Sequence, residues 1–200
     1  MKSAQKEGLK VLLDKYCTDI DHAKHVKKLS LMLFDKTNGY LHSYSNKKRN
    51  LLKAGALLHD IGHYIGNEDH NKNSYKIIMQ EGISGFDEEE IQIIANIARY
   101  HRGKVPGPKH ENYTQISDKK TRKLIKRLGG IVKIADGLDA SHLGFIESIN
   151  CEYDEHFKIL YIIMNPSNPG YEPDIEILIK KKDLFEQAFK TQVVFKIKEA

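Results

Sequence analysis

The feature that most constrains the fold is an ionisable pair at the end of an apolar segment. Residues 57–70 read LLHDIGHYIGNEDH, so His59 and Asp60 directly follow residues typical of a protein core. An unpaired polar or charged group in a core costs several kcal/mol, so such a pair needs partners there. The rest of the chain must therefore bring further polar or cationic groups to this point.

Hydrophobic periodicity predicts a mainly helical body. The expected helices cover about 4–16, Asp19 or Asp21 to Lys36, 47–61, 70–81, 88–102 and 118–143. Gly62 is expected to end the third helix, and Gly129-Gly130 could interrupt the last one. Asp87 and Glu90 have the spacing of a capping box, which favours a helix start at that point.

The sequence pattern changes after residue 145. Three stretches, 145–154, 157–165 and 174–182, alternate in polarity or are rich in β-forming residues, and we interpret them as strands. A short helix over 182–190 and a final strand over 192–197 are expected to follow. The predicted organisation is therefore a helical domain, 1–145, with a small α+β module of order β-β-β-α-β, 146–200.

Composition indicates a folded protein of the cytoplasm. The 200 residues are 40% hydrophobic and 30% charged, and they include neither a signal peptide nor the roughly 20-residue apolar run of a membrane helix. Cys17 and Cys151 are too few and too far apart for a disulfide framework, which favours a reducing compartment. A net charge of +5 suits an anionic partner, although basic surfaces are common.

Further ionisable residues share faces with apolar ones. His22 lies on the same helical face as Val26 and Leu29, and taken alone it would be read as a satisfied core histidine. His101 and Asp136 repeat the pattern on their own helices. Inward imidazoles and carboxylates from several helices favour a metal site over a purely structural network, and this ligand set suits Zn, Mn, Fe, Ni, Co or Mg.

The order of these residues resembles the H…HD…D signature of the HD superfamily of metal-dependent phosphohydrolases. Five blocks in order look like the HD-type domain at the C-terminal side of the exopolyphosphatase/guanosine pentaphosphatase (Ppx/GppA) family: DHAKHVKKLSLMLFDKT, LLKAGALLHDIGHYI, HNKNSYKII, IANIARYHRGKVP and IVKIADGLDASHLGFI. That family places its polyphosphate-hydrolysing site in N-terminal actin-like domains. We expect a stand-alone HD-type helical bundle here, and we do not assign exopolyphosphatase activity by that mechanism.

The resemblance implies one or two divalent ions. Mononuclear relatives bind through the residues that correspond to His22, His59, Asp60 and Asp136. Binuclear members add two histidines, for which His70 and His101 are suitably placed. Asn71 and Asn73 stand where further histidines are expected, but His70 is retained, so two ions are favoured over one. Asp60 would bridge the two ions and orient the nucleophile.

Cationic residues near this motif are candidates for binding phosphate. We assign this role to His63, Arg102 and Lys104, although a solvated turn residue is an equal interpretation of His63. Asp139 and His142 either support Asp136 or cap the helix end. The basic stretch 118–133 is better explained as the solvated face of an amphipathic helix than as a path that guides a polyanion.

Three functions remain open from the sequence. The first is a phosphohydrolase that cleaves phosphomonoester, phosphodiester or phosphoanhydride bonds of a small phosphorylated substrate such as a nucleotide or polyphosphate. The second is a regulatory or ligand-binding module that partners a separate exopolyphosphatase-type catalytic protein. An RNA-binding role ranks last because only charge supports it, and no membrane partner is expected. The sequence is compatible with a homodimer.

Overall fold

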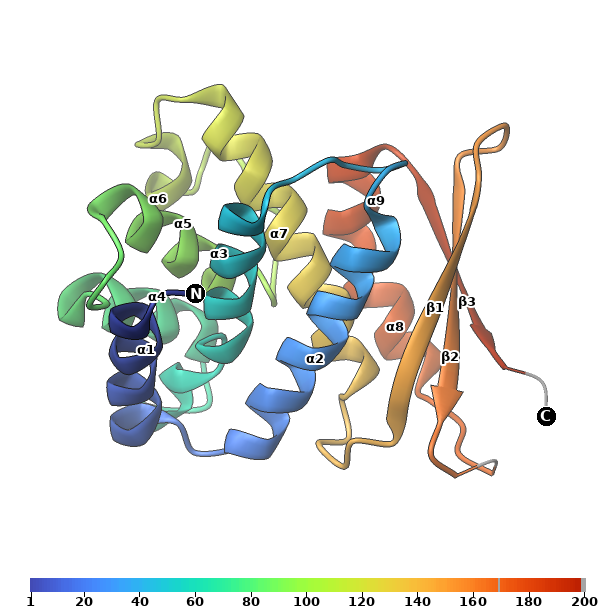
Figure 1. Ribbon diagram of the computed structural model, residues 1–200, viewed down its shortest axis with the longest axis horizontal. Helices are drawn as coiled ribbons and strands as arrows, with labels where there is room; N and C mark the ends of the chain where they lie inside the picture. Colours follow the sequence, from blue (N-terminus) through green and yellow to red (C-terminus); the bar gives the residue numbers. More distant parts are fainter. Residues whose placement is uncertain (169, 199–200) are drawn as a thin grey trace.

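The chain folds into a helical body with a small sheet at one end (Figure 1). The computed structural model describes residues 1–168 and 170–198. In chain order its elements are α1 Ser3–Tyr16, α2 Ile20–Thr37, α3 Asn46–Leu57, the 3-10 turn η1 Ile61–Tyr64, α4 His70–Glu81, α5 Glu88–Arg99, α6 Glu111–Thr114, α7 Lys119–Leu138, β1 Ile146–Asp154, β2 Ile159–Pro166, α8 Ile175–Lys181, α9 Asp183–Phe189 and β3 Gln192–Ile197. The mainly α fold with a C-terminal sheet is confirmed. Within the described residues, no helix has both the length and the apolarity to cross a membrane.

Local capping signals explain several helix starts. The side chain of Asp19 accepts a hydrogen bond from the backbone N–H of His22 and caps α2. Asp87 and Glu90 form the predicted capping box of α5, each side chain bonding the other's backbone N–H. These contacts satisfy N–H groups that the first helical turn leaves without partners.

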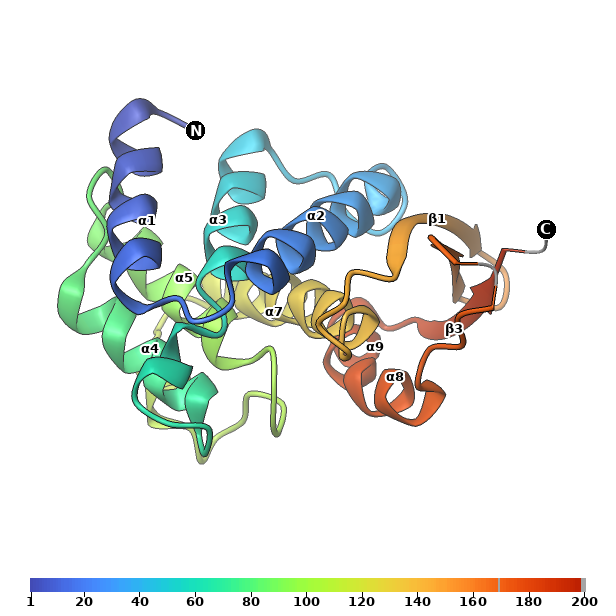
Figure 2. The ribbon, with the colours of Figure 1, turned by 90° about the horizontal axis from the view of Figure 1, so that it is seen from below.

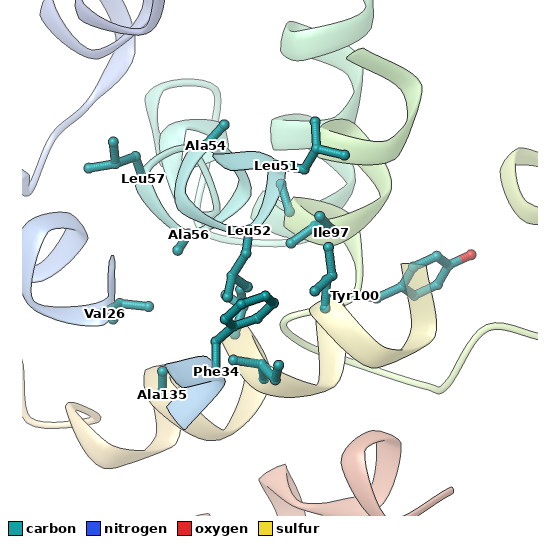
Figure 3. Close-up of a cluster of buried hydrophobic side chains, with 14 of the residues drawn as sticks. Val26, Phe34, Leu51, Leu52, Ala54, Ala56, Leu57, Ile97, Tyr100 and Ala135 are labelled. Atoms are coloured by element: carbon teal, nitrogen blue, oxygen red, sulfur yellow. The ribbon is translucent and has the colours of Figure 1, made fainter. Parts of the chain in front are cut away.

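The core lies between α2, α3, α5 and α7. Figure 3 shows Val26, Leu52, Ile97 and Ala135, one from each of these helices, directed into a common space. All four side chains are fully buried. Because α7 packs against α2, α3 and α5, it forms the central element of the body.

The third helix ends earlier than predicted, at Leu57 rather than near residue 61. The hydroxyl of Ser74, on α4, donates a hydrogen bond to the carbonyl of His59 (2.6 Å) and accepts one from the N–H of Gly62 (2.9 Å). A Cβ atom on Gly62 would lie 1.9 Å from the carbonyl oxygen of His70. This tertiary contact with α4 turns the chain after α3, so His59 and Asp60 lie in a tight turn and not in the helix.

The prediction of a strand over 174–182 is wrong, because this stretch forms α8. Asp174 accepts a hydrogen bond from the N–H of Ile177 and caps the helix, and lysines occupy its last turn. The module therefore has the order β-β-α-α-β. β1 and β2 pair antiparallel and β3 adds parallel to β2; Figure 2 shows α8 and α9 between α7 and this sheet.

The two glycines in α7 do not interrupt the helix, which is continuous from Lys119 to Leu138. Instead, Gly130 allows α9 to approach closely. A Cβ atom on Gly130 would lie 2.8 Å from the Cα and 2.9 Å from the backbone nitrogen of Phe185, whereas one on Gly129 would make only ordinary contacts at 3.5 Å. The α7–α9 contact therefore depends on Gly130.

These neighbouring positions give a matched test of the α7–α9 contact. Gly130→Ala should lower the free energy of unfolding by about 1–3 kcal/mol, because backbone atoms of α9 must move. Gly129→Ala should raise it by up to about 1 kcal/mol, since alanine favours a helix over glycine. Urea unfolding followed by circular dichroism measures both values, and equal effects of the two variants would contradict this account of α9 packing.

Candidate metal centre

The six predicted ligands meet at one end of the helical body, although they come from five segments of the chain. His22 lies in the first turn of α2, and His59 and Asp60 lie in the turn before η1. His70 begins α4, His101 follows α5, and Asp136 lies near the end of α7. All four imidazoles are at most 3% exposed, so these side chains have little access to water.

Each of the four imidazoles has its Nδ1 atom bonded on the side away from the centre. The Nδ1 partners are Asp139 Oδ2 for His22 (2.8 Å), Ala56 O for His59 (2.9 Å), Asn67 O for His70 (3.1 Å) and Ala98 O for His101 (2.6 Å). A carbonyl oxygen only accepts hydrogen bonds, so Nδ1 carries the proton in the three rings that face one. The Nε2 lone pairs are thereby directed toward the centre, which is the arrangement in which histidine binds metals.

The Nε2 atoms meet in two pairs. His22 and His59 bring theirs to 3.2 Å from each other, and His70 and His101 do the same. In the second pair both rings are protonated at Nδ1, so two unprotonated nitrogens face each other and neither can donate. A cation between them would satisfy both lone pairs.

Asp60 lies between the two imidazole pairs and presents one oxygen to each. Its Oδ2 atom is 3.7 Å from Nε2 of His22 and 3.4 Å from Nε2 of His59. Its Oδ1 atom is 3.4 Å from His70 and 3.2 Å from His101. Among the described residues, Oδ1 is buried without a hydrogen-bond partner, which is costly unless a cation binds it.

Asp136 adds a second carboxylate to the first imidazole pair. Its Oδ1 atom lies 3.4 Å from Nε2 of His22 and 3.7 Å from that of His59. Its other oxygen, Oδ2, binds the ammonium group of Lys181 on α8. By these distances the donors form one set of two nitrogens and two oxygens and a second of two nitrogens and one oxygen, with His63 and His142 close enough to add a nitrogen. Nitrogen and oxygen donors of this kind fit divalent metals.

The electrostatics of the centre follow from this geometry. Burial disfavours the charged form of His22, but hydrogen bonds with Asp136 and Asp139 raise its pKa to about 9. Burial and the neighbouring His101 lower the pKa of His70 to about 4. Burial alone would raise the pKa of the Asp60 carboxyl, but His59 and His101 hold it below its usual range.

A pocket of about 400 Å³ opens beside these residues. Of the three residues proposed from the sequence to bind phosphate, His63 and Arg102 line this pocket, whereas Lys104 lines a neighbouring hollow. His63 stacks on His70 with ring centroids 4.0 Å apart, and its Nδ1 atom is bonded to Asn67. A positioned ring is therefore a better description of His63 than a freely solvated turn residue.

Two further lysines line this pocket, Lys180 and Lys181, and neither was predicted from the sequence. They lie in the stretch interpreted as a strand, and a strand directs successive side chains to opposite faces. The capping position of Asp174, three residues before Ile177, is the signal that could have indicated a helix there.

Asp139 and His142 both contact the ring of His22. Asp139 lies at its Nδ1 edge, and His142 lies against its face. Asp139 binds Nδ1 of His22, so it does more than cap α7. The ring of His142 stacks on that of His22 at 3.7 Å and 5°, and Asp19 holds its Nδ1 atom at 2.9 Å. Both residues therefore fix the orientation of His22.

The raised pKa of His22 predicts how the metal-free protein responds to pH. Histidine in the unfolded chain titrates near 6.5 and in the folded protein near 9. The protonated ring stabilises the folded state fully below about pH 6.5, and this stabilisation is lost as the pH rises through 9. In EDTA, the free energy of unfolding should fall by about 1–3 kcal/mol between these pH values. His22→Gln should lose this dependence; a fall of the same size in that variant would refute the assignment to His22.

A comparison with known protein families identifies the family of this chain. Residues 6–172 match the family model described as Ppx/GppA phosphatase, domain III. The match includes all six predicted ligands and covers most of the chain. The chain therefore belongs to the Ppx/GppA phosphatase domain III family and is a phosphatase-related protein.

Proposed function

We propose that this protein is a metal-dependent phosphohydrolase with a binuclear centre. The observation that carries the proposal is the position of Asp60, whose two oxygens face two separate pairs of imidazole nitrogens. One ion would be held by His22, His59, Asp136 and one oxygen of Asp60. The second would be held by His70, His101 and the other oxygen of Asp60.

The ligand types narrow the choice of metal. Four neutral imidazoles and two carboxylates suit Mn, Fe, Co, Ni or Zn better than Mg, which prefers oxygen ligands and retained waters. His63 could add a donor to the second set, since its Nε2 atom lies 3.7 Å from Oδ2 of Asp60 and it groups with Asp60 and His70. These residues line the pocket, so substrate or water could reach this set, as is typical of catalytic rather than structural sites.

Divalent ions held here would supply the Lewis acidity that activates water and polarises a phosphoryl oxygen. The chain's own residues bind and orient the substrate. Arg102 and Lys180 line the pocket, and their cationic groups would pair with phosphoryl oxygens. Lys181 holds Oδ2 of Asp136, which leaves Oδ1 directed toward the imidazoles.

The pocket fits a phosphate ester or anhydride of small size. It combines a concave shape, cationic side chains and four of the proposed metal donors, Asp60, His70, His101 and Asp136, around about 400 Å³. We therefore propose a phosphomonoester, phosphodiester or phosphoanhydride as substrate, with nucleotides included. Metal and phosphate binding without turnover would instead support the regulatory module that the sequence left open.

Metal analysis of the purified protein, with a hydrolysis screen over phosphate esters, nucleotides and inorganic polyphosphates, tests this proposal. The wild-type protein should hold close to two ions after incubation with Mn or Co. Asp60→Asn keeps the side-chain shape but removes the shared anion, so it should lower metal content and reduce activity by at least about 100-fold.

Asp21→Asn serves as the matched control, because Asp21 lies beside His22 in the sequence but is exposed. It should change neither the metal content nor the rate. The proposal fails if the wild-type protein binds no ion and hydrolyses nothing after Mn, Fe, Co, Ni, Zn or Mg is added. Activity that survives complete loss of metal in Asp60→Asn would contradict the assigned site.

A further inference from the structure

A second hollow adjoins the metal pocket and shares Arg102 with it. Its volume is about 310 Å³, and residues 101–104, which follow α5, contribute to the lining of one hollow or the other. The side chains that line it are Asp69, Asn71, Lys72, Arg99, Tyr100, Arg102, Lys104 and His110. Arg102 is exposed and lines both hollows. A ligand in either hollow could therefore contact its guanidinium group.

Buried polar side chains of α4 and α7 hold the backbone of residues 99–104 in place. The amide of Asn71, on α4, donates to the carbonyls of Arg99 (2.8 Å) and Arg102 (3.2 Å). The ammonium of Lys133, on α7, donates to the carbonyl of Gly103 (2.8 Å). Lys133 is only 4% exposed, so this is an interior contact. The cationic residues of this segment are therefore presented by a fixed backbone.

The second hollow has a strong excess of positive charge. Its one carboxylate, Asp69, is already paired with Lys72 at 2.6 Å. Within 1–168 and 170–198, no carboxylate lies at ion-pair distance from Arg99, Arg102 or Lys104.

One pKa shift agrees with this excess of positive charge. Burial and the charges of Arg99, Lys104 and Lys72 lower the pKa of His110. A hollow with such unbalanced cations stabilises an anion.

We propose that this hollow is a second anion subsite, which binds a further phosphate of a substrate whose first phosphate is held at the metal pocket. This inference rests on the proposed function, since it assigns the first phosphate to that pocket. Arg102 would lie between the two groups and contact both. The substrate would then carry at least two linked phosphates, and a phosphomonoester would leave the second hollow empty.

Two kinds of compound share this chemistry, an inorganic phosphoanhydride chain and a nucleoside triphosphate. The residues described for the subsite recognise phosphate oxygens and would not distinguish between them. A nucleoside would need an additional contact beyond the cations, whereas an inorganic chain would not. Equal affinity for both compounds would indicate that the phosphates alone are recognised.

The binding test compares Lys104→Ala with Lys109→Ala. Both lysines are exposed and belong to the same loop, but only Lys104 lines the hollow. The probe is inorganic tripolyphosphate, titrated into the full-length protein by calorimetry in EDTA at 0.15 M salt, where distant charges are largely screened. Lys104→Ala should weaken binding roughly threefold to tenfold, and Lys109→Ala should leave it unchanged.

Nuclear magnetic resonance adds a readout at the level of residues. Tripolyphosphate should shift the backbone amide signals of Gly103 and Lys104 in the wild-type protein, and less so in Lys104→Ala. Equal losses of affinity in the two variants, or shifts confined to other parts of the chain, would overturn the subsite. A nucleoside triphosphate titrated in parallel identifies which of the two compounds binds more tightly.

The titration in EDTA tests the second subsite independently of the metal centre. EDTA removes the ions, so tripolyphosphate binding at the second hollow does not require an active metal centre. Metal binding and hydrolysis with no effect of Lys104→Ala would refute the subsite and retain the phosphohydrolase. Subsite binding in a protein that holds no metal would refute the phosphohydrolase and retain the subsite.

Discussion

The structure depends on a single carboxylate placed where two pairs of imidazoles meet. Asp60 is mostly buried, and its oxygens face nitrogen atoms from α2, α4 and the ends of α3 and α5. A buried anion is tolerated only when positive or proton-donating groups surround it. The helices of the body therefore converge at this residue, and the turn that carries it is fixed by Ser74 on α4.

The same constraint explains why α7 is the longest and most buried helix. One end of α7 brings Asp136 and Asp139 to the centre, and its middle accepts α9 against Gly130. Lys133 connects these regions, because it binds both the carbonyl of Gly103 and the carboxylate of Asp183 at the start of α9. The C-terminal segment also contributes to the centre, because Lys181 on α8 forms an ion pair with Asp136.

Much of this arrangement could be predicted from the sequence. Apolar periodicity located the helices, and the inward faces of His22, His101 and Asp136 indicated a common site, because burial leaves ionisable groups few alternatives. The early end of α3 could not be predicted, since it depends on a hydrogen bond to Ser74 from another helix. The role of Lys181 could not be predicted either, because the isoleucines of α8 alternate along the sequence as they would in a strand. Only the cap of α8 and its packing against α7 favour the helix.

The centre draws its side chains from positions 22 to 136, with Lys181 added from farther along the chain. No short stretch contains a complete donor set, so an unfolded chain would bind an ion far more weakly than the folded one. Any ion held there would stabilise the folded state, and the stabilisation would grow with the logarithm of the free ion concentration once that exceeds the dissociation constant. The donor set is complete only when α7, which carries Asp136, has packed against the earlier helices. The centre would therefore form together with the tertiary structure and not before it.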